Sequence, residues 1–175
     1  MSSQKGLFVA TAIAFLALVG ASSAKADTTC FTLGSFKGTY AVVAHYEGGV
    51  ANAFGVRHLD DEGNLTGTFV LNEPVTGSTT GARTIVTGTQ KGSITTLNCD
   101  GTGVITRVLT ASNGIVTTQM DDFVVTQAIE EHGHLRVTAI HDAQRTPSAL
   151  VSPPVLVTRE WTRTPDTKAP EESGQ

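Results

Sequence analysis

Turn signals recur about every 8 to 14 residues along this chain, and this spacing constrains its fold more than any other feature. Between the turns the chain is rich in Val, Thr, Ile, Gly and Phe, residue types that suit a pleated, half-buried strand. The same region lacks helical periodicity. Short strands joined by short connections predict an all-β domain in which successive strands pair antiparallel.

We expect about nine strands. They cover residues 39–46, 51–59, 65–73, 83–89, 93–98, 103–110, 115–129, 135–142 and 155–163. The connections carry Gly, Asn or Asp, which adopt positive φ at little cost in hairpin turns. Lys91-Gly92, Asp100-Gly101 and Asn113-Gly114 are examples.

Closure of the sheet into an up-and-down barrel of 8 or 9 strands removes both sheet edges. This suits a sheet protein in which only 16% of residues are charged and few can guard an edge strand. A β-sandwich is the alternative. Pro147, Pro153 and Pro154 interrupt the segment before the last strand, so we expect that longer connection to cover one mouth of the barrel.

The two ends of the chain are predicted to lie outside this domain. Lys5 precedes an apolar run, and Ala24-Lys25-Ala26 has the form of a signal-peptidase site, so residues 1–26 predict a signal peptide cleaved before Asp27. The apolar run is shorter than the roughly 20 residues that span a membrane. We therefore expect a secreted or periplasmic protein with one barrel domain over 27–163 and a disordered tail over 164–175.

Net charge limits the classes of partner expected for this chain, and cysteine content indicates the redox state of its thiols. The chain has 12 Lys plus Arg and 16 Asp plus Glu, and loss of the signal peptide removes two lysines and no acid, leaving a net charge of −6. Nucleic-acid binding is not expected of such a chain. Cys30 and Cys99 are the 2 cysteines, and export predicts one disulfide between them.

Alternation along the strands assigns the inward faces. The residues expected inside are Tyr40, Val42, Ala44, Tyr46, Phe54, Val56, Leu65, Gly67, Phe69, Leu71, Phe123, Val125, Gln127, Ile129, Leu135, Val137, Ala139 and His141. His141 is of special interest, because an inward imidazole suits proton transfer near neutral pH. The alternative is a histidine at the rim, bonded to Asp142 or to water.

Gly38-Thr39-Tyr40, after an irregular lead-in from Cys30 to Lys37, resembles the glycine-x-tryptophan signature of the lipocalin (calycin) superfamily, with Tyr in place of Trp. The last strand resembles the one that carries a late Arg across that aromatic at the closed end, and Arg159 and Arg163 both fit. The wider pattern is similar to exported bacterial proteins with no assigned activity. The resemblance implies a small β-barrel with a central cavity that binds a small apolar ligand.

Motifs for catalysis and cofactors are not found in the sequence. It has no Gly-x-Ser-x-Gly elbow and no phosphate-binding glycine loop, so we set hydrolases aside and expect no cofactor. The His132-Gly133-His134 segment is interpreted as a solvated turn rather than a metal site. The acidic turn at residues 60–64 lacks the ligand spacing of an EF-hand and is interpreted in the same way.

Three functions remain open. The leading hypothesis is a barrel that binds a small apolar molecule, with walls and polar anchors at Tyr40, Phe54, Phe69, Phe123, Gln127, Val137, His141 and Trp161. The second is an enzyme of the cyclase or isomerase type, whose candidate acid or base groups are His141 and Glu160. The third is a structural or adhesive envelope protein with a filled core. The oligomeric state is left open.

Overall fold

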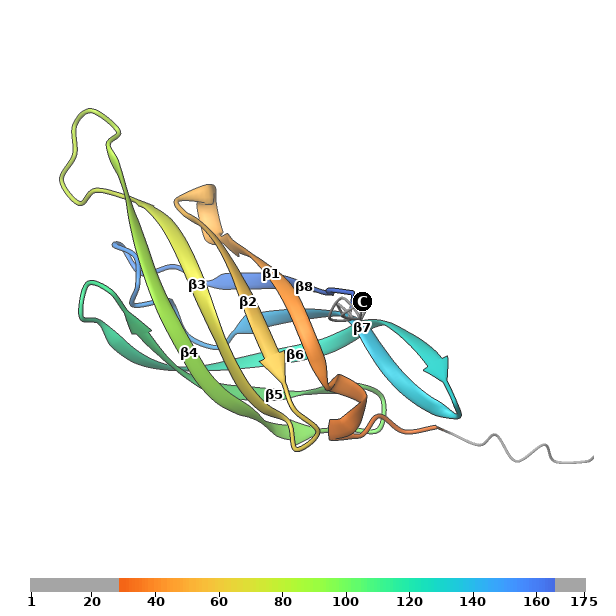
Figure 1. Cartoon of the computed structure of the whole chain (residues 1–175). Helices are drawn as coiled ribbons and strands as arrows, with labels where there is room; N and C mark the ends of the chain where they lie inside the picture. Colours follow the sequence, from red (N-terminus) through yellow and green to blue (C-terminus); the bar gives the residue numbers. More distant parts are fainter. Residues whose placement is uncertain (1–28, 166–175) are drawn as a thin grey trace, which may run out of the picture.

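The computed structural model describes residues 29–165 and shows a closed up-and-down barrel of antiparallel strands (Figure 1). The expected barrel is therefore confirmed over the sandwich. The strands are β1 Gly38–Tyr46, β2 Asn52–Leu59, β3 Asn64–Pro74, β4 Arg83–Leu97, β5 Thr102–Ala111, β6 Val116–Glu131, β7 His134–Gln144 and β8 Val157–Arg163. Each strand pairs with the next in the chain, and β8 pairs with β1 to close the barrel.

The described residues contain almost no helix. Two short 3-10 turns, η1 (Leu33–Phe36) and η2 (Glu47–Gly49), flank β1. The predicted signal peptide and all of the predicted tail except Thr164 and Pro165 lie outside the described residues. Within residues 29–165 no helix has the length and apolar character required to cross a membrane.

Two apolar clusters fill the two ends of the barrel. We call the end next to η1 the plug end and the end covered by the β7–β8 connection the loop end. The plug-end cluster contains Phe36, Tyr40, Val42, Leu59, Leu65, Ile94, Ile105, Phe123, Val137, Ile140 and Trp161. The loop-end cluster contains Ala44, Tyr46, Ala51, Ala53, Phe69, Leu71, Val86, Leu109, Ala111, Leu150, Val151 and Val157.

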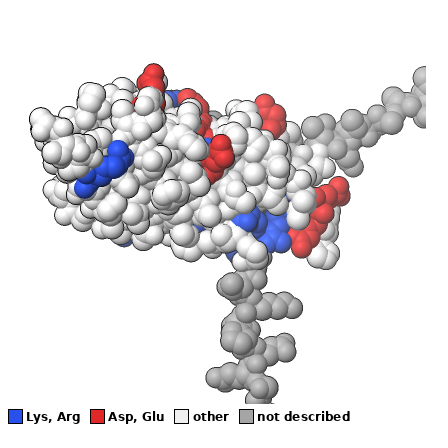
Figure 2. Space-filling model, turned by 90° about the horizontal axis from the view of Figure 1, so that it is seen from above, with Lys and Arg blue, Asp and Glu red and all other residues white. Residues whose placement is uncertain are grey.

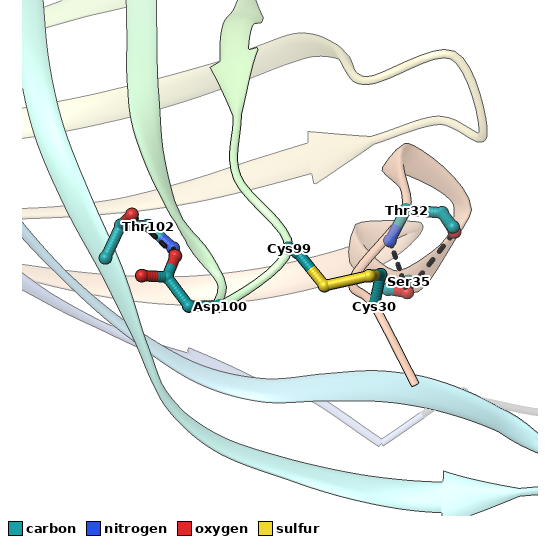
Figure 3. The surroundings of a disulfide bond; sticks show 6 residues. All are labelled: Cys30, Thr32, Ser35, Cys99, Asp100 and Thr102. Atoms are coloured by element: carbon teal, nitrogen blue, oxygen red, sulfur yellow. Dashed lines mark hydrogen bonds between the residues drawn. A yellow bond between two sulfur atoms is a disulfide. The ribbon is translucent and has the colours of Figure 1, made fainter. Parts of the chain in front are cut away.

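The predicted disulfide is present at the plug end (Figure 3). It joins Cys30, in the lead-in to η1, to Cys99 in the β4–β5 turn, over a sequence separation of 69 residues. The lead-in also packs on the barrel through Phe36, whose ring lies edge-on to Phe123 with centroids 5.5 Å apart. The disulfide therefore holds the segment that plugs this end, and a disulfide fits an oxidising compartment.

We expect the Cys30→Ser/Cys99→Ser variant to lose up to about 4 kcal/mol of unfolding free energy, because the bridge restrains a long loop in the unfolded chain. Urea unfolding of the oxidised protein and of the double variant measures this difference. Addition of a reductant should lower the stability of the oxidised protein toward that of the variant and leave the variant unchanged. Equal stability of the two proteins under oxidising conditions would contradict this role.

Strand β4 corrects one sequence prediction. Lys91-Gly92 was expected to be a turn, but β4 runs unbroken from Arg83 to Leu97, so the barrel has one strand fewer than the nine expected. Gly92 serves to let β5 approach. A Cβ at position 92 would lie 2.7 Å from the Cα and Cβ of Arg107 and would also collide with the Thr106 carbonyl. The glycine makes room for a large inward side chain on the neighbouring strand.

Gly92→Ala should therefore destabilise the barrel by about 1–3 kcal/mol, the usual effect of overpacking a well-packed interior. Gly34→Ala in η1 is the matched control, because a Cβ there meets only Thr32 Oγ1 at an ordinary 3.7 Å. Thermal or urea unfolding of the two variants compares them. A Gly92→Ala protein as stable as the Gly34→Ala protein would refute the packing role.

Alternation predicted the inward faces of β1 and β3 correctly. Tyr40, Val42, Ala44 and Tyr46 on β1 are buried, as are Leu65, Phe69 and Leu71 on β3. On β2 the prediction was wrong. Phe54 and Val56 are 59% and 37% exposed, and the inward positions belong to Ala53, Gly55, Arg57 and Leu59. Arg57 is inside because the barrel supplies charged partners for it, and its burial places the aromatic Phe54 outside.

Strand β7 corrects the prediction for His141. The β6–β7 pairing shifts register between Val125 and Ala128, and Val137 and Ile140 are both buried although three residues apart. Such a bulge reverses the alternation along the strand. His141 is therefore exposed on the outer surface, and Asp142 faces inward in its place.

The distal part of the β6–β7 hairpin extends beyond the barrel wall at the plug end (Figure 1). Residues 126–134 are exposed on both faces of the hairpin, so position along the strand no longer decides burial there. Gln127 and Ile129, which were expected inside, lie on this exposed segment.

Candidate functional site

A layer of polar side chains crosses the barrel interior between the two apolar clusters, and we call it the polar layer. Its members are Arg57, Gln90, Arg107, Gln119, Asp121, Asp142, Gln144 and Arg159. Each is at most 6% exposed, and together they come from β2, β4, β5, β6, β7 and β8. Exposed charges, in contrast, are scattered in small groups over the face in Figure 2, most of which is uncharged.

Asp121 on β6 is one of two carboxylates in this layer. One oxygen accepts a hydrogen bond of 2.6 Å from Nε of Arg107, and the other accepts from Arg107 Nη2 at 3.2 Å. This is the bidentate geometry in which a guanidinium binds a carboxylate best. Arg159 Nη1 donates to the same carboxylate at 3.0 Å. The Asp121 carboxylate therefore forms ion pairs with both Arg107 and Arg159.

Asp142 on β7 is the second carboxylate, and it joins opposite walls of the barrel. It accepts hydrogen bonds from Arg57 Nη1 at 3.1 Å, from Arg159 Nη1 at 2.7 Å and from Trp161 Nε1 at 2.6 Å. The Arg57 guanidinium also lies 4.0 Å from the centre of the Trp161 ring, a cation–π contact. Trp161 thus borders the polar layer from the plug-end cluster.

Burial and mutual interaction shift the pKa values of these groups. Burial raises the pKa of Asp121, but Arg159 and Arg107 outweigh it and hold that pKa at about 2. Desolvation and the neighbouring Arg107 lower the pKa of Arg57 to about 9, and desolvation also lowers the pKa of Arg107. Arg159 is the exception, since Asp142 and Asp121 overcome its desolvation and raise its pKa. With pKa values of about 2 and about 9, Asp121 and Arg57 are both charged at neutral pH.

The low pKa of Asp121 predicts acid sensitivity. Since this pKa is about 2 in the fold and about 3.9 in an unfolded chain, the stabilisation is complete above pH 4 and is lost as the pH falls toward 2. The loss is roughly 2 kcal/mol. Urea unfolding should show the stability difference between the parent and Asp121→Asn shrinking over this range.

Asp122→Asn is the matched control for that experiment. Asp122 is the next residue along β6, but its side chain is 59% exposed and pairs with Arg145 on the outer surface. Exposed pairs contribute little to stability. A difference between parent and Asp121→Asn that stays constant from pH 6 to pH 2 would contradict the assignment.

A small cavity of about 30 Å³ lies on the loop-end side of the polar layer. It is lined by Val42, Ala44, Tyr46, Ala53, Phe54, Gly55, Arg57, Phe69, Gln90, Arg107, Leu109, Gln119, Leu150 and Arg159. All three buried arginines reach it, whereas Asp121 and Asp142 do not line it. A volume of this size holds only a few atoms. The cavity therefore has apolar walls and a cationic floor.

Gln119 is the polar residue of this lining that the fold leaves unsatisfied. Its Oε1 is buried and has no hydrogen-bond partner among the described residues, although the residue is only 3% exposed. Buried polar groups are nearly always bonded, so an orphaned amide at a cavity points to a bound water or ligand. Gln119 lies directly across from Arg107 on the neighbouring strand.

The β7–β8 connection (145–156) closes the cavity from the loop end, as its prolines and length predicted. Leu150 and Val151 are 4% and 5% exposed and belong to the loop-end cluster. The Ser148 N–H donates to the Val155 carbonyl at 2.7 Å, and the Ser148 side chain interacts with Tyr46. Burial raises the pKa of that tyrosine, whose hydroxyl is thus a neutral hydrogen-bonding group. The connection is anchored to the barrel wall and places Leu150 over the cavity.

The structure separates the residues predicted to line a ligand site. Phe69 lines the cavity. Tyr40, Phe123, Val137 and Trp161 are buried as expected, but in the plug-end cluster on the other side of the polar layer. Phe54 belongs to a strand that borders the cavity, yet its side chain is exposed on the outer wall.

The predicted polar anchors and catalytic candidates lie on the outside. Gln127, His141 and Glu160 are all exposed. Glu160 is the cross-strand partner of His141 on β7 and lies 3.8 Å from His45 on β1. The cyclase or isomerase hypothesis therefore loses the two residues on which it depended.

The acidic turn beside β3 is stabilised by its own hydrogen bonds. Asp60, Asp61 and Glu62 bring carboxylate oxygens within 4.8 Å of one another. However, Asp60 accepts hydrogen bonds from the backbone N–H groups of Glu62 and Asn64, and Asp61 pairs with Lys37 at 3.0 Å. These contacts fit the solvated turn that was expected.

Alternation on single strands was the only sequence signal for the residues of the polar layer. Arg57 follows Ala53 and Gly55 in phase on β2, and Arg107 lies between Ile105 and Leu109 on β5. A charged residue in phase with apolar neighbours indicates burial only when a partner is known. The partners come from other strands, 85 residues away in the chain for Arg57 and 14 for Arg107, so sequence reasoning missed the site.

Comparison with protein-family models, with curated proteins and with solved structures finds no match. The barrel itself agrees with the architecture that the lipocalin resemblance implies. Of the two arginines considered for the last strand, Arg163 lies over the Tyr40 ring, 5.7 Å from its centre, and donates to its hydroxyl at 3.3 Å. Arg159 belongs to the polar layer.

Proposed function

We propose that this protein is an exported β-barrel that binds a small molecule in the cavity between the polar layer and the β7–β8 connection. One observation carries the proposal: three buried arginines and an unsatisfied glutamine converge on one cavity inside a closed barrel. Apolar walls with a few convergent polar groups are typical of small-molecule sites. Export rests on the predicted signal peptide, and the disulfide supports it.

The lining gives the ligand two chemically different surroundings. Val42, Phe69 and Leu109 provide apolar walls, and of these three Phe69 was predicted to line a site for an apolar ligand. The arginines and Gln119 would bind a polar end by hydrogen bonds. Because Leu150 covers the cavity, a ligand larger than a few atoms requires displacement of the β7–β8 connection.

Binding can be tested with Gln119→Leu. Since Gln119 Oε1 has no partner in the fold, this variant should fold with unchanged or higher stability and lose ligand binding. The readouts are the shift of the thermal midpoint with a library of charged and neutral small molecules, and the fluorescence of Trp161, the 1 tryptophan of the chain.

Gln127→Leu is the matched control for that test, because Gln127 is an exposed glutamine on the same strand. The control should respond to ligands as the parent does. The proposal would be refuted if no compound in the library stabilised the parent, or if Gln119→Leu responded to ligands as strongly as the parent does.

The structural hypothesis depends on a different surface. Phe54 lies in direct cross-strand register with Val43 and Val70, and all three are exposed on the outer wall. This apolar patch and the small cavity volume are the two observations that favour a structural or adhesive role. Gln119→Leu leaves the patch unchanged, so the ligand experiment distinguishes the two functions.

A further inference from the structure

The charges of the polar layer do not balance. Among the described residues, the buried charged side chains are Arg57, Arg107, Arg159, Asp121 and Asp142. Three positive and two negative groups leave one positive charge in an interior that is closed by apolar clusters at both ends. An uncompensated charge in such surroundings is strongly destabilising.

A further acid near the layer lies outside it. Glu73 interacts with Tyr46 at the loop end, but it is only partly buried and is absent from the cavity lining. Burial raises the pKa of Glu73. Among the described residues, the ion pairs of the three arginines are made with Asp121 and Asp142 and not with Glu73. The surplus charge of the layer is therefore not neutralised by this residue.

The surplus positive charge faces the cavity. Each guanidinium has five N–H donors, yet the three arginines make only eight hydrogen bonds to side chains of the layer. Both carboxylates bind the arginines away from the cavity, whereas all three arginines contribute to its lining. Burial lowers the pKa of Arg57, and repulsion from the neighbouring Arg107 lowers it further.

We infer that the cavity binds a monovalent planar oxyanion of a few atoms, a class represented by formate, acetate, nitrate and bicarbonate. This inference rests on the proposed function and specifies the ligand's charge and shape. A planar oxyanion matches the fork of a guanidinium and accepts two parallel hydrogen bonds from it. One negative charge makes the buried layer neutral, and the cavity volume of about 30 Å³ limits the ligand to this size.

Other charge classes fit less well. A dianion such as sulfate would leave the layer with a net negative charge, which is as unfavourable as the positive one. A neutral isostere such as acetamide would leave the surplus charge uncompensated. Gln119 discriminates among monoanions, because its unpaired Oε1 can only accept a hydrogen bond. Bicarbonate keeps a hydroxyl and can donate to Oε1, whereas formate, acetate and nitrate can only accept from the Gln119 Nε2 amide.

The inference is tested on the full mature protein after exhaustive dialysis into a buffer whose anions are too large for the cavity. Formate, acetate, nitrate, bicarbonate, sulfate, acetamide and chloride are titrated at constant ionic strength. We expect the planar monoanions to raise the thermal midpoint saturably, and to change Trp161 fluorescence in parallel. Sulfate and acetamide should have no saturable effect, and chloride should bind at least tenfold more weakly than the best oxyanion.

Gln119→Glu provides an independent test that needs no ligand. Its carboxylate would supply the missing negative charge from within the fold, directly across from Arg107. We expect this variant to have a higher thermal midpoint than the parent and to lose the response to monoanions. Gln127→Glu adds the same charge on the exposed part of β6, and is expected to change neither property.

The outcomes separate this inference from the proposed function. If neutral or dianionic compounds stabilise the parent through Gln119 and planar monoanions do not, the protein binds a ligand in the cavity but the inference is wrong. If no compound of any charge stabilises it, both are wrong. A Gln119→Glu protein that is less stable than the parent, or that still responds to monoanions, also overturns the inference.

Discussion

Burial of three arginines against two aspartates is the interaction on which the barrel interior depends. In a closed barrel these charges have no access to bulk water, so each needs a partner from another strand. Asp142 on β7 holds Arg57 on β2 and Arg159 on β8, and Asp121 on β6 holds Arg107 on β5 and also Arg159. A slip of one residue in any of these strands would turn its charged group outward and leave the partner buried alone. The ion pairs thus make the registers of β2, β5, β6, β7 and β8 dependent on one another.

The rest of the interior is organised around this layer. Apolar clusters lie on both sides and exclude water, which strengthens the ion pairs and makes any unpaired group expensive. Trp161 joins the layer to the plug-end cluster through its N–H and its ring. Gly92 leaves the space that Arg107 fills. The small cavity lies where the arginines lack counter-charges, so the site and the architecture have a common cause.

Sequence reasoning was accurate where burial follows from local alternation. Strands β1 and β3 have no bulge on their inward-facing stretch, and their apolar residues are inside as expected. It failed where non-local structure decides the orientation. The irregular β6–β7 pairing turns His141 outward, and the charged partners of Arg57 keep Phe54 on the outer wall. Lys91-Gly92 was interpreted as a turn because glycine is common in turns. The large side chain that Gly92 accommodates belongs to another strand, so the pattern along β4 could not reveal it.

The amino-acid sequence by itself determined the all-β class, the antiparallel order of strands, the single disulfide pairing that two cysteines allow, and the covering connection before the last strand. These features depend on residue type, spacing and turn chemistry, which are local. Only the tertiary structure decided which charged residues are inside. Arg57 and Asp142 are 85 residues apart, and Arg159 and Asp121 are 38 apart. An isolated strand with one arginine predicts a surface residue, because the free energy of burying that charge becomes acceptable only when closure of the barrel brings its partner to it.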